Sequence, residues 1–198
     1  IDNAPFLNKA IKLILTGGES DDFFFPSGKP NFIAISFPLP SYPQKYYTKG
    51  IKIITKTYER PYPEAKGTNY LSAVMGALEA KKLSAHGVLF VGSNGNLLEG
   101  GRENFFAIKQ GVLITPKCGI LKGITREVIL EIAKTLCPLQ VRDIHLREIP
   151  SFDAAFLTST QKEIMPVSQI DNFILPDVNT SSLLNELIVS FRKYTHCF

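Results

Sequence analysis

The chain has 198 residues, of which 44% are hydrophobic and 20% are charged, and this composition is ordinary for a folded globular protein. The formal net charge is +4, and the basic residues are scattered rather than clustered, so the charge pattern does not indicate a nucleic-acid partner. No apolar run approaches the ~18 residues that a membrane-spanning helix needs, and the first residues do not resemble a signal peptide. We therefore expect neither a nucleic-acid partner nor a membrane partner.

Short apolar runs, bounded by glycine, proline and polar turn residues, predict a chain rich in strands. In chain order, strands are expected at residues 11–15, 32–37, 51–58, 88–91, 105–108, 112–115, 152–158 and 163–170. The dipeptides Asn94-Gly95 and Gln110-Gly111 predict hairpin turns between neighbouring strands. The three prolines between residues 38 and 43 predict an irregular connection.

Three segments carry apolar residues at helical spacing. The first begins after Thr68 or Asn69, either of which could act as the N-cap, the second spans about 124–136, and the third begins near Ser181. Many strands interrupted by a few helices predict an α+β fold around a mixed or antiparallel sheet. The sequence contains no GxGxxG motif and no P-loop, which argues against dinucleotide and nucleoside triphosphate ligands.

Three cysteines, an odd number without a CxxC pair, are widely spaced in the sequence (Cys118, Cys137 and Cys197). This pattern predicts free thiols in a reducing compartment rather than a disulfide framework or a zinc site. We therefore expect a cytoplasmic protein without a metal site.

Two charged residues are candidates for chemistry, although each has a simpler structural interpretation. Lys66 lies between a proline-rich link and a predicted helix, where most lysines are solvated surface residues. Glu99 follows a strand and a hairpin turn, and on its own it would be interpreted as a surface carboxylate.

Two polar segments are candidates for anion binding. Residues 121–126 open a helix, so Gly123 would allow a close approach while the free amide groups of Ile124 and Thr125 bind a phosphate. Alternatively, Gly123 only ends the loop and Thr125 caps the helix. Residues 158–161 (TSTQ) end a strand, where hydroxyl groups suit anion binding but also occur as ordinary turns.

Five motifs follow one another in a specific order. They are residues 66–71 (KGTNYL), 98–106 (LEGGRENFF), 113–116 (LITP), 121–126 (LKGITR) and 158–167 (TSTQKEIMPV). Together they resemble the class IV (fold-type IV) aminotransferase family, whose members use pyridoxal phosphate. The family includes branched-chain aminotransferases, D-amino-acid aminotransferases and aminodeoxychorismate lyases. The resemblance is dense from Lys66 to Asp171.

The resemblance implies a role for each matching residue. Lys66 would hold pyridoxal phosphate covalently and move a proton during the reaction, and Glu99 would pair with the pyridine nitrogen of the cofactor. Asn104 would fix a loop, and Thr160 and Gln161 would receive the substrate carboxylate. The residues expected to bind the cofactor are Lys66, Glu99, Leu121, Gly123, Ile124, Thr125, Ser159 and Thr160.

The resemblance also implies a domain organisation. Residues 1–18 would form the link and first strand from a small N-terminal domain, and residues 19–198 would form the large domain that binds pyridoxal phosphate. The resemblance implies that most of the small domain is absent from this chain, either because the N-terminal part lies outside this sequence or because the chain is a truncated relative, and the arginine that it contributes to the cofactor phosphate in the family is not located here. The resemblance also implies that the protein forms a homodimer.

The expected activity is transamination from an amino acid, branched-chain or of the D series, to a 2-keto acid. One alternative is an aminodeoxychorismate lyase, which would use the same lysine to release pyruvate. The other is a catalytically degenerate remnant that binds pyridoxal phosphate weakly and turns over no substrate.

Overall fold

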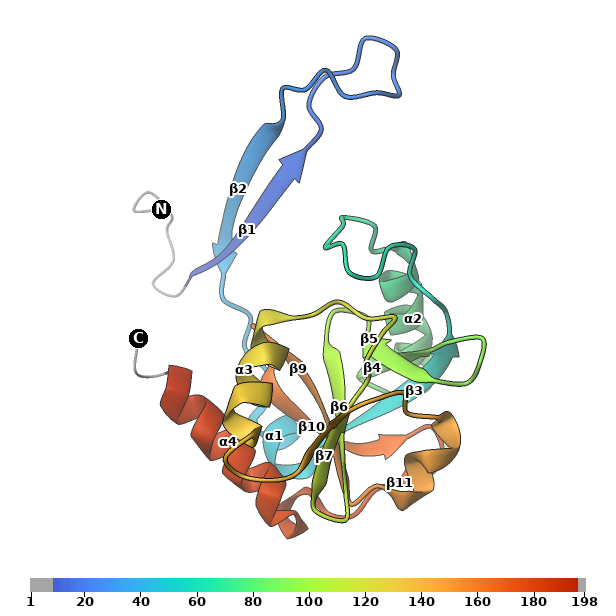
Figure 1. Cartoon of the computed structure of the whole chain (residues 1–198), viewed down its shortest axis with the longest axis vertical. Coiled ribbons are helices and arrows are strands. Elements are labelled where there is room, and N and C mark those ends of the chain that lie inside the picture. Colours follow the sequence, from blue (N-terminus) through green and yellow to red (C-terminus); the bar gives the residue numbers. More distant parts are fainter. Residues whose placement is uncertain (1–8, 196–198) are drawn as a thin grey trace. The chain divides into compact units, whose positions relative to one another are not determined.

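The computed structural model describes residues 9–195 and divides into two compact units, Ile1–Ser41 and Tyr42–Phe198. The first unit contains the antiparallel hairpin of β1 (Lys9–Thr16) and β2 (Asn31–Pro38), drawn in blue in Figure 1. The sequence-based boundary between residues 18 and 19 differs from this division, because β1 pairs with β2 along its whole length. The assignment of the units to domains of the family stays a prediction.

The second unit is built on a nine-stranded sheet, six of whose strands form a closed ring. Successive pairing of β10 with β3, β4, β5, β6 and β9 returns to β10, because β9 pairs with both β6 and β10. Closure leaves these six strands without a free edge. The ring strands are β3 (Ile51–Thr57), β4 (Gly87–Val91), β5 (Leu97–Gly100), β6 (Asn104–Lys109), β9 (Ala154–Ser159) and β10 (Glu163–Ile170).

The remaining strands extend the ring at two places. β7 (Val112–Thr115) pairs with β6, and β8 (Leu139–Val141) pairs in parallel with β7. β11 (Phe173–Ile174) pairs with β10. All eight predicted strands are present, whereas β5, β8 and β11 were not predicted. Because parallel and antiparallel pairs occur together, the sheet is mixed, as one of the two sequence-based alternatives expected.

Alternation along the strands sorts their apolar side chains between the inside and the outside of the ring. One buried cluster collects residues from all six ring strands, including Leu89, Phe105 and Leu157, and fills the interior. Residues one position away, such as Phe106 and Phe156, point to the outer face, where their rings stack with centroids 4.9 Å apart. The ring is therefore a packed core, and ligands must bind at its ends or outer face.

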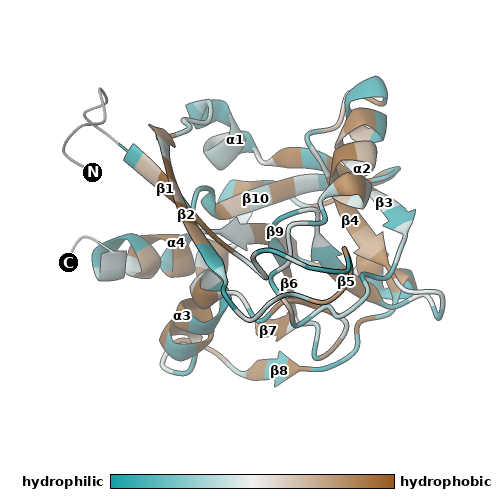
Figure 2. Cartoon of the chain, turned by 90° about the horizontal axis from the view of Figure 1, so that it is seen from above, coloured by the Kyte–Doolittle hydropathy of each residue, from teal (hydrophilic) through white to brown (hydrophobic). Residues whose placement is uncertain are grey.

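Helices cover the outer face of the ring (Figures 1 and 2). α2 (Leu71–Lys82) packs on β3 and β4, and a Cβ atom at Gly76 would lie 2.8 Å from Cγ1 of Val88, so glycine allows the close approach. Its N-cap residue is Tyr70, not Thr68 or Asn69; the Asn69 side chain instead accepts a bond from the amide of Leu71.

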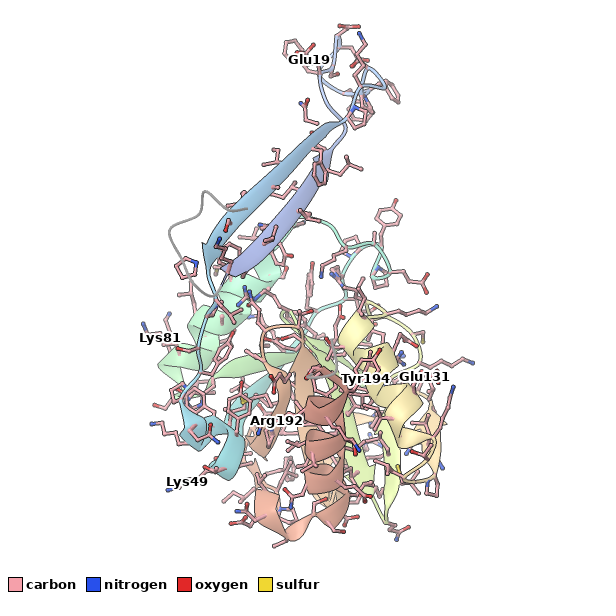
Figure 3. The ribbon with its side chains drawn as sticks, turned by 90° about the vertical axis from the view of Figure 1, so that its left-hand side faces the viewer. Glu19, Lys49, Lys81, Glu131, Arg192 and Tyr194 are labelled. Carbon is pink, nitrogen blue, oxygen red and sulfur yellow. The ribbon has the colours of Figure 1, made fainter. Side chains whose placement is uncertain are left out.

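Two other helices, α3 (Ile124–Ala133) and α4 (Ser182–Thr195), lie side by side and cover the cluster that contains Phe106 and Phe156. Near the end of α4, Arg192 (labelled in Figure 3) donates to Glu163 of β10 across 3.3 Å. Shorter elements complete the unit: α1 (Gln44–Lys49) and the 3-10 turns η1 (Leu146–Ser151) and η2 (Val178–Thr180).

Among residues 9–195, no helix combines the length and the apolar character needed to cross a membrane. Cys118 and Cys137 are free thiols, as the sequence predicts, and Cys197 lies outside the described residues. Burial raises the pKa of both described thiols above its ordinary value.

Candidate active site

A cavity of about 340 Å³ opens in the second unit, where loops meet at one end of the ring. Its lining combines the loop before α2, the β5–β6 turn, the loop that leads into α3 and the end of β9. Eight of the nine predicted site residues line it: Lys66, Glu99, Leu121, Gly123, Ile124, Thr125, Ser159 and Thr160. Gln161, the other predicted substrate residue, lies in the turn after them and is not part of the lining.

Strand register explains why residues far apart in the sequence meet here. Glu99 of β5 lies opposite Asn104 of β6, and Asn104 lies opposite Thr158 of β9. Cross-strand partners in adjacent strands lie only a few ångströms apart. A carboxylate, an amide and a hydroxyl-bearing residue are therefore adjacent at one end of three neighbouring strands.

Asn104 connects this strand end to the start of α3. Its Nδ2 donates to the carbonyl of Leu121 across 2.6 Å, and a Cβ atom at Gly123 would clash with its Oδ1. Gly123 is the N-cap residue of α3 and provides no side-chain cap, so the alternative in which Thr125 caps the helix is wrong. The first amides of α3 therefore have no intrahelical acceptor at the cavity, which suits an anionic group.

The close approach at Gly123 leads to a testable prediction. Gly123→Ala is expected to destabilise the protein by about 1–3 kcal/mol because the added methyl group must displace Asn104 or the Leu121 loop. Gly67→Ala is the matched control, since a Cβ there meets nothing within 4 Å. Denaturant unfolding measures the free energy of unfolding of both variants. An equal loss of stability in the two would show that the contact with Asn104 is unimportant.

Glu99 is a buried carboxylate with a partner for each oxygen. Arg60 donates to Oε1, and the amide of Leu121 donates to Oε2 across 2.9 Å. Burial raises the pKa of Glu99 above its ordinary value, while the Leu121 amide, Arg60 and Lys66 act in the opposite direction. A positively charged group beside Glu99 would favour its ionised form further.

Arg60 is a site residue that the sequence analysis missed. Its guanidinium donates to Glu99 and also to the carbonyl of Pro63 across 3.0 Å. It thus connects the buried carboxylate to the loop that carries Lys66. Its only sequence signal is a position in the proline-containing link six residues before Lys66, where an arginine is usually solvated.

Lys66 itself lies in an exposed segment between a turn and α2. The turn is closed by backbone bonds from Ala65 to Tyr62 and from Gly67 to Ala65, each 2.9 Å long. Arg60 holds this turn at Pro63. The Lys66 amine is therefore carried on a loop that these hydrogen bonds hold at the cavity, where a ligand can reach it.

Two buried polar atoms at the cavity have no hydrogen-bond partner among residues 9–195. They are Oγ1 of Thr158 and Nε of Arg60. Unpaired buried polar atoms are rare and costly in folded proteins. Both residues line the cavity, where a bound polar group or a water molecule would supply the missing partner.

A comparison with protein families gives a match over residues 1–170 to the model described as amino-transferase class IV. The chain belongs to the class IV amino-transferase family. A putative branched-chain-amino-acid aminotransferase of Methanocaldococcus jannaschii is 31% identical over 192 residues, covering 92% of this chain and 66% of that protein. A probable branched-chain enzyme of Thermotoga maritima is 36% identical over 135 residues, covering 67% and 49%, respectively.

Solved structures share the fold. The branched-chain amino acid aminotransferase of Escherichia coli matches with a TM-score of 0.82 and 26% identity, over 92% of this chain and 64% of that one. A putative 4-amino-4-deoxychorismate lyase of Legionella pneumophila gives the same TM-score and identity, over 92% and 69%. The fold class predicted from the sequence is confirmed. The chain spans between about half and two thirds of the length of the curated relatives described above.

Proposed function

We propose that this class IV chain carries the cofactor site of a pyridoxal-phosphate-dependent amino-acid aminotransferase. The observation that carries the proposal is one cavity that brings together an amine, a buried carboxylate and a helix N-terminus, contributed by Lys66, Glu99 and α3. These are the three types of group that the cofactor requires at its aldehyde, its ring nitrogen and its phosphate.

The residues present fit pyridoxal phosphate. The free amides of Ile124 and Thr125 and the hydroxyl groups of Ser159 and Thr160 are suitable donors for a phosphate. The unpaired Oγ1 of Thr158 adds a further buried polar atom at the same cavity. Lys66 supplies the amine, and Glu99, held by Arg60, supplies an acceptor for a ring N–H. The role of each of these residues is part of the proposal.

When bound, pyridoxal phosphate supplies a conjugated ring that withdraws electrons from the α-carbon of the substrate. Glu99 holds a proton on the ring nitrogen, and Arg60 and the Leu121 amide keep the carboxylate in place for this task. Nζ of Lys66 would hold the cofactor covalently and, when free, would take the proton from the α-carbon of the substrate. The backbone around Thr160, which lines the cavity, and the adjoining Gln161 would receive the substrate carboxylate.

Branched-chain amino acids are the proposed donors and 2-keto acids the proposed acceptors. The support is that curated relatives are named branched-chain aminotransferases; D-amino acids remain the second substrate class. Solved structures titled 4-amino-4-deoxychorismate lyase match as well as the Escherichia coli aminotransferase, and this favours a lyase as the second candidate function. A homodimer is proposed from the family resemblance, and a cytoplasmic location from the three unpaired cysteines of the sequence.

The test is to load the purified protein with pyridoxal phosphate and follow its visible absorption during addition of single amino acids. Transamination predicts that the absorption changes with a branched-chain or D-amino acid and recovers when a 2-keto acid is added. Pyruvate released from aminodeoxychorismate without a keto acid would instead identify the lyase. Cofactor binding without any response to substrates would contradict both activities and leave a degenerate remnant.

A further inference from the structure

The turn between β9 and β10 is held by an ion pair that the proposed function does not use. The turn consists of residues 160–162 and contains Thr160 and Gln161, the proposed receivers of the substrate carboxylate. Nζ of Lys162, the last residue of the turn, lies 2.5 Å from Oε1 of Glu103, which belongs to the β5–β6 turn and lines the cavity. Two turns of the cavity wall therefore meet at one largely buried pair of charges.

Glu103 is fixed on its own turn by contacts that do not involve Lys162. Its Oε2 accepts from the amide of Arg102 across 2.9 Å, and its carbonyl accepts from the amide of Gly100 across 2.7 Å. A Cβ atom at Gly100 would lie 2.7 Å from Oε2, so the carboxylate packs directly on the backbone of the turn. The β5–β6 turn thereby sets the position of Oε1, and Lys162 has a fixed acceptor.

The turn that carries Lys162 is restrained at its other residues too. The amide of Lys162 donates to Oγ of Ser159 across 3.3 Å, which closes the turn on itself. The next residue, Glu163, has a left-handed backbone conformation (φ 54°), which is uncommon for a residue other than glycine. Its carboxylate accepts from Nε of Arg192 in α4 across 3.3 Å. Such a conformation persists only where its surroundings hold it, and here the β5–β6 turn and α4 hold successive residues.

We propose that the Lys162–Glu103 pair positions the turn that binds the substrate carboxylate, so that both are positioning residues of the site. This inference rests on the proposed function, because Thr160 and Gln161 receive the carboxylate only in that proposal. Neither charge needs to touch the substrate, since the pair acts by fixing the backbone of the turn. Hydrogen bonds weaken steeply when their geometry is disturbed, so a displaced turn would bind the carboxylate less tightly.

The cofactor phosphate should depend much less on this pair. Its proposed donors at the start of α3 are held by Asn104, through the carbonyl of Leu121 and the close approach at Gly123. That contact involves neither member of the ion pair. Loss of the pair should therefore weaken binding of the substrate carboxylate while the affinity for pyridoxal phosphate is retained. A purely structural role predicts no such difference between the two ligands.

The experiment uses the double variant Lys162→Met with Glu103→Gln, which removes both charges and leaves neither one unpaired. It is expected to raise the KM for 4-methyl-2-oxopentanoate about 10-fold and to change kcat and the affinity for pyridoxal phosphate less than about twofold. Lys162→Arg keeps the charge and should retain the KM within about twofold. Lys134→Met with Glu131→Gln removes an exposed ion pair in the same way and is the matched control.

A binding measurement without turnover separates this inference from the proposed function. Calorimetry with 4-methylpentanoate, a branched carboxylate that cannot react, should show an affinity about 10-fold lower in the double variant and unchanged in the control. If the protein transaminates no substrate but this difference is present, the proposed activity fails and the positioning role stands. An unchanged affinity for the carboxylate, an equal loss of affinity for pyridoxal phosphate, or an equal loss in Lys162→Arg would overturn the inference.

Discussion

Replacing Lys66 with alanine is expected to lower transamination by about 10⁴-fold or more, because the variant loses both the covalent link to the cofactor and the group that moves the proton. Neither function has an obvious substitute. Lys122 also lines the cavity, but it lies beside Glu64 at 3.4 Å and is carried by a different loop. The loss should therefore be far larger than that of any other lysine.

The measurement has two parts. Borohydride reduction followed by peptide mass mapping should place the cofactor on the peptide that contains Lys66, and no adduct should form in Lys66→Ala. Turnover of Lys81→Ala is the control, because Lys81 lies exposed in the last turn of α2 (Figure 3). An adduct on the peptide that contains Lys122, or full activity in Lys66→Ala, would show that the assignment is wrong.

The strands that the sequence predicted are those whose apolar residues alternate or form a continuous run, such as β3 and β10. β5 escapes this signal because it has only four residues and ends in glycine. α1 escapes because it has only six residues and packs on the core through two partly buried tyrosines, Tyr46 and Tyr47, which is too short a stretch to show a helical period. The spacing of apolar residues predicts the elements that bury a face in the core. An element that buries few residues has no such spacing and cannot be predicted in this way.

The candidate site shows a similar limit. Lys66, Glu99 and Gly123 were predicted as site residues because of a family resemblance, since each has an ordinary structural interpretation on its own. Arg60 was missed because its importance depends on meeting Glu99, which is 39 positions away in the sequence. The contact between Arg60 and Glu99 depends on strand register and on the path of the loop, and a local sequence pattern shows neither. The same holds for Lys162 and Glu103, whose pairing no motif indicates.

Lys162 and Glu103 form a largely buried ion pair in the cavity wall, so removing either charge alone should be costly. Nζ of Lys162 lies 2.5 Å from Oε1 of Glu103, and the two side chains are only 12% and 9% exposed. Lys162 also lies over the ring of Tyr42, 5.6 Å from its centroid. Removing one member of a buried ion pair leaves the other charge without compensation, which costs far more than the pair itself contributes.

Lys162→Met is therefore expected to lower the free energy of unfolding by about 3 kcal/mol, since Glu103 then remains buried without its partner. The double variant Lys162→Met with Glu103→Gln removes both charges and should recover most of this loss. Lys134→Met is the matched control: its partner Glu131 is 70% exposed, and such pairs contribute at most about 0.5 kcal/mol. Denaturant unfolding measures all three. If the single and double variants lost the same stability, the effect would come from lost packing. The β5–β6 turn and the turn after β9 would then be held together by contacts other than charge.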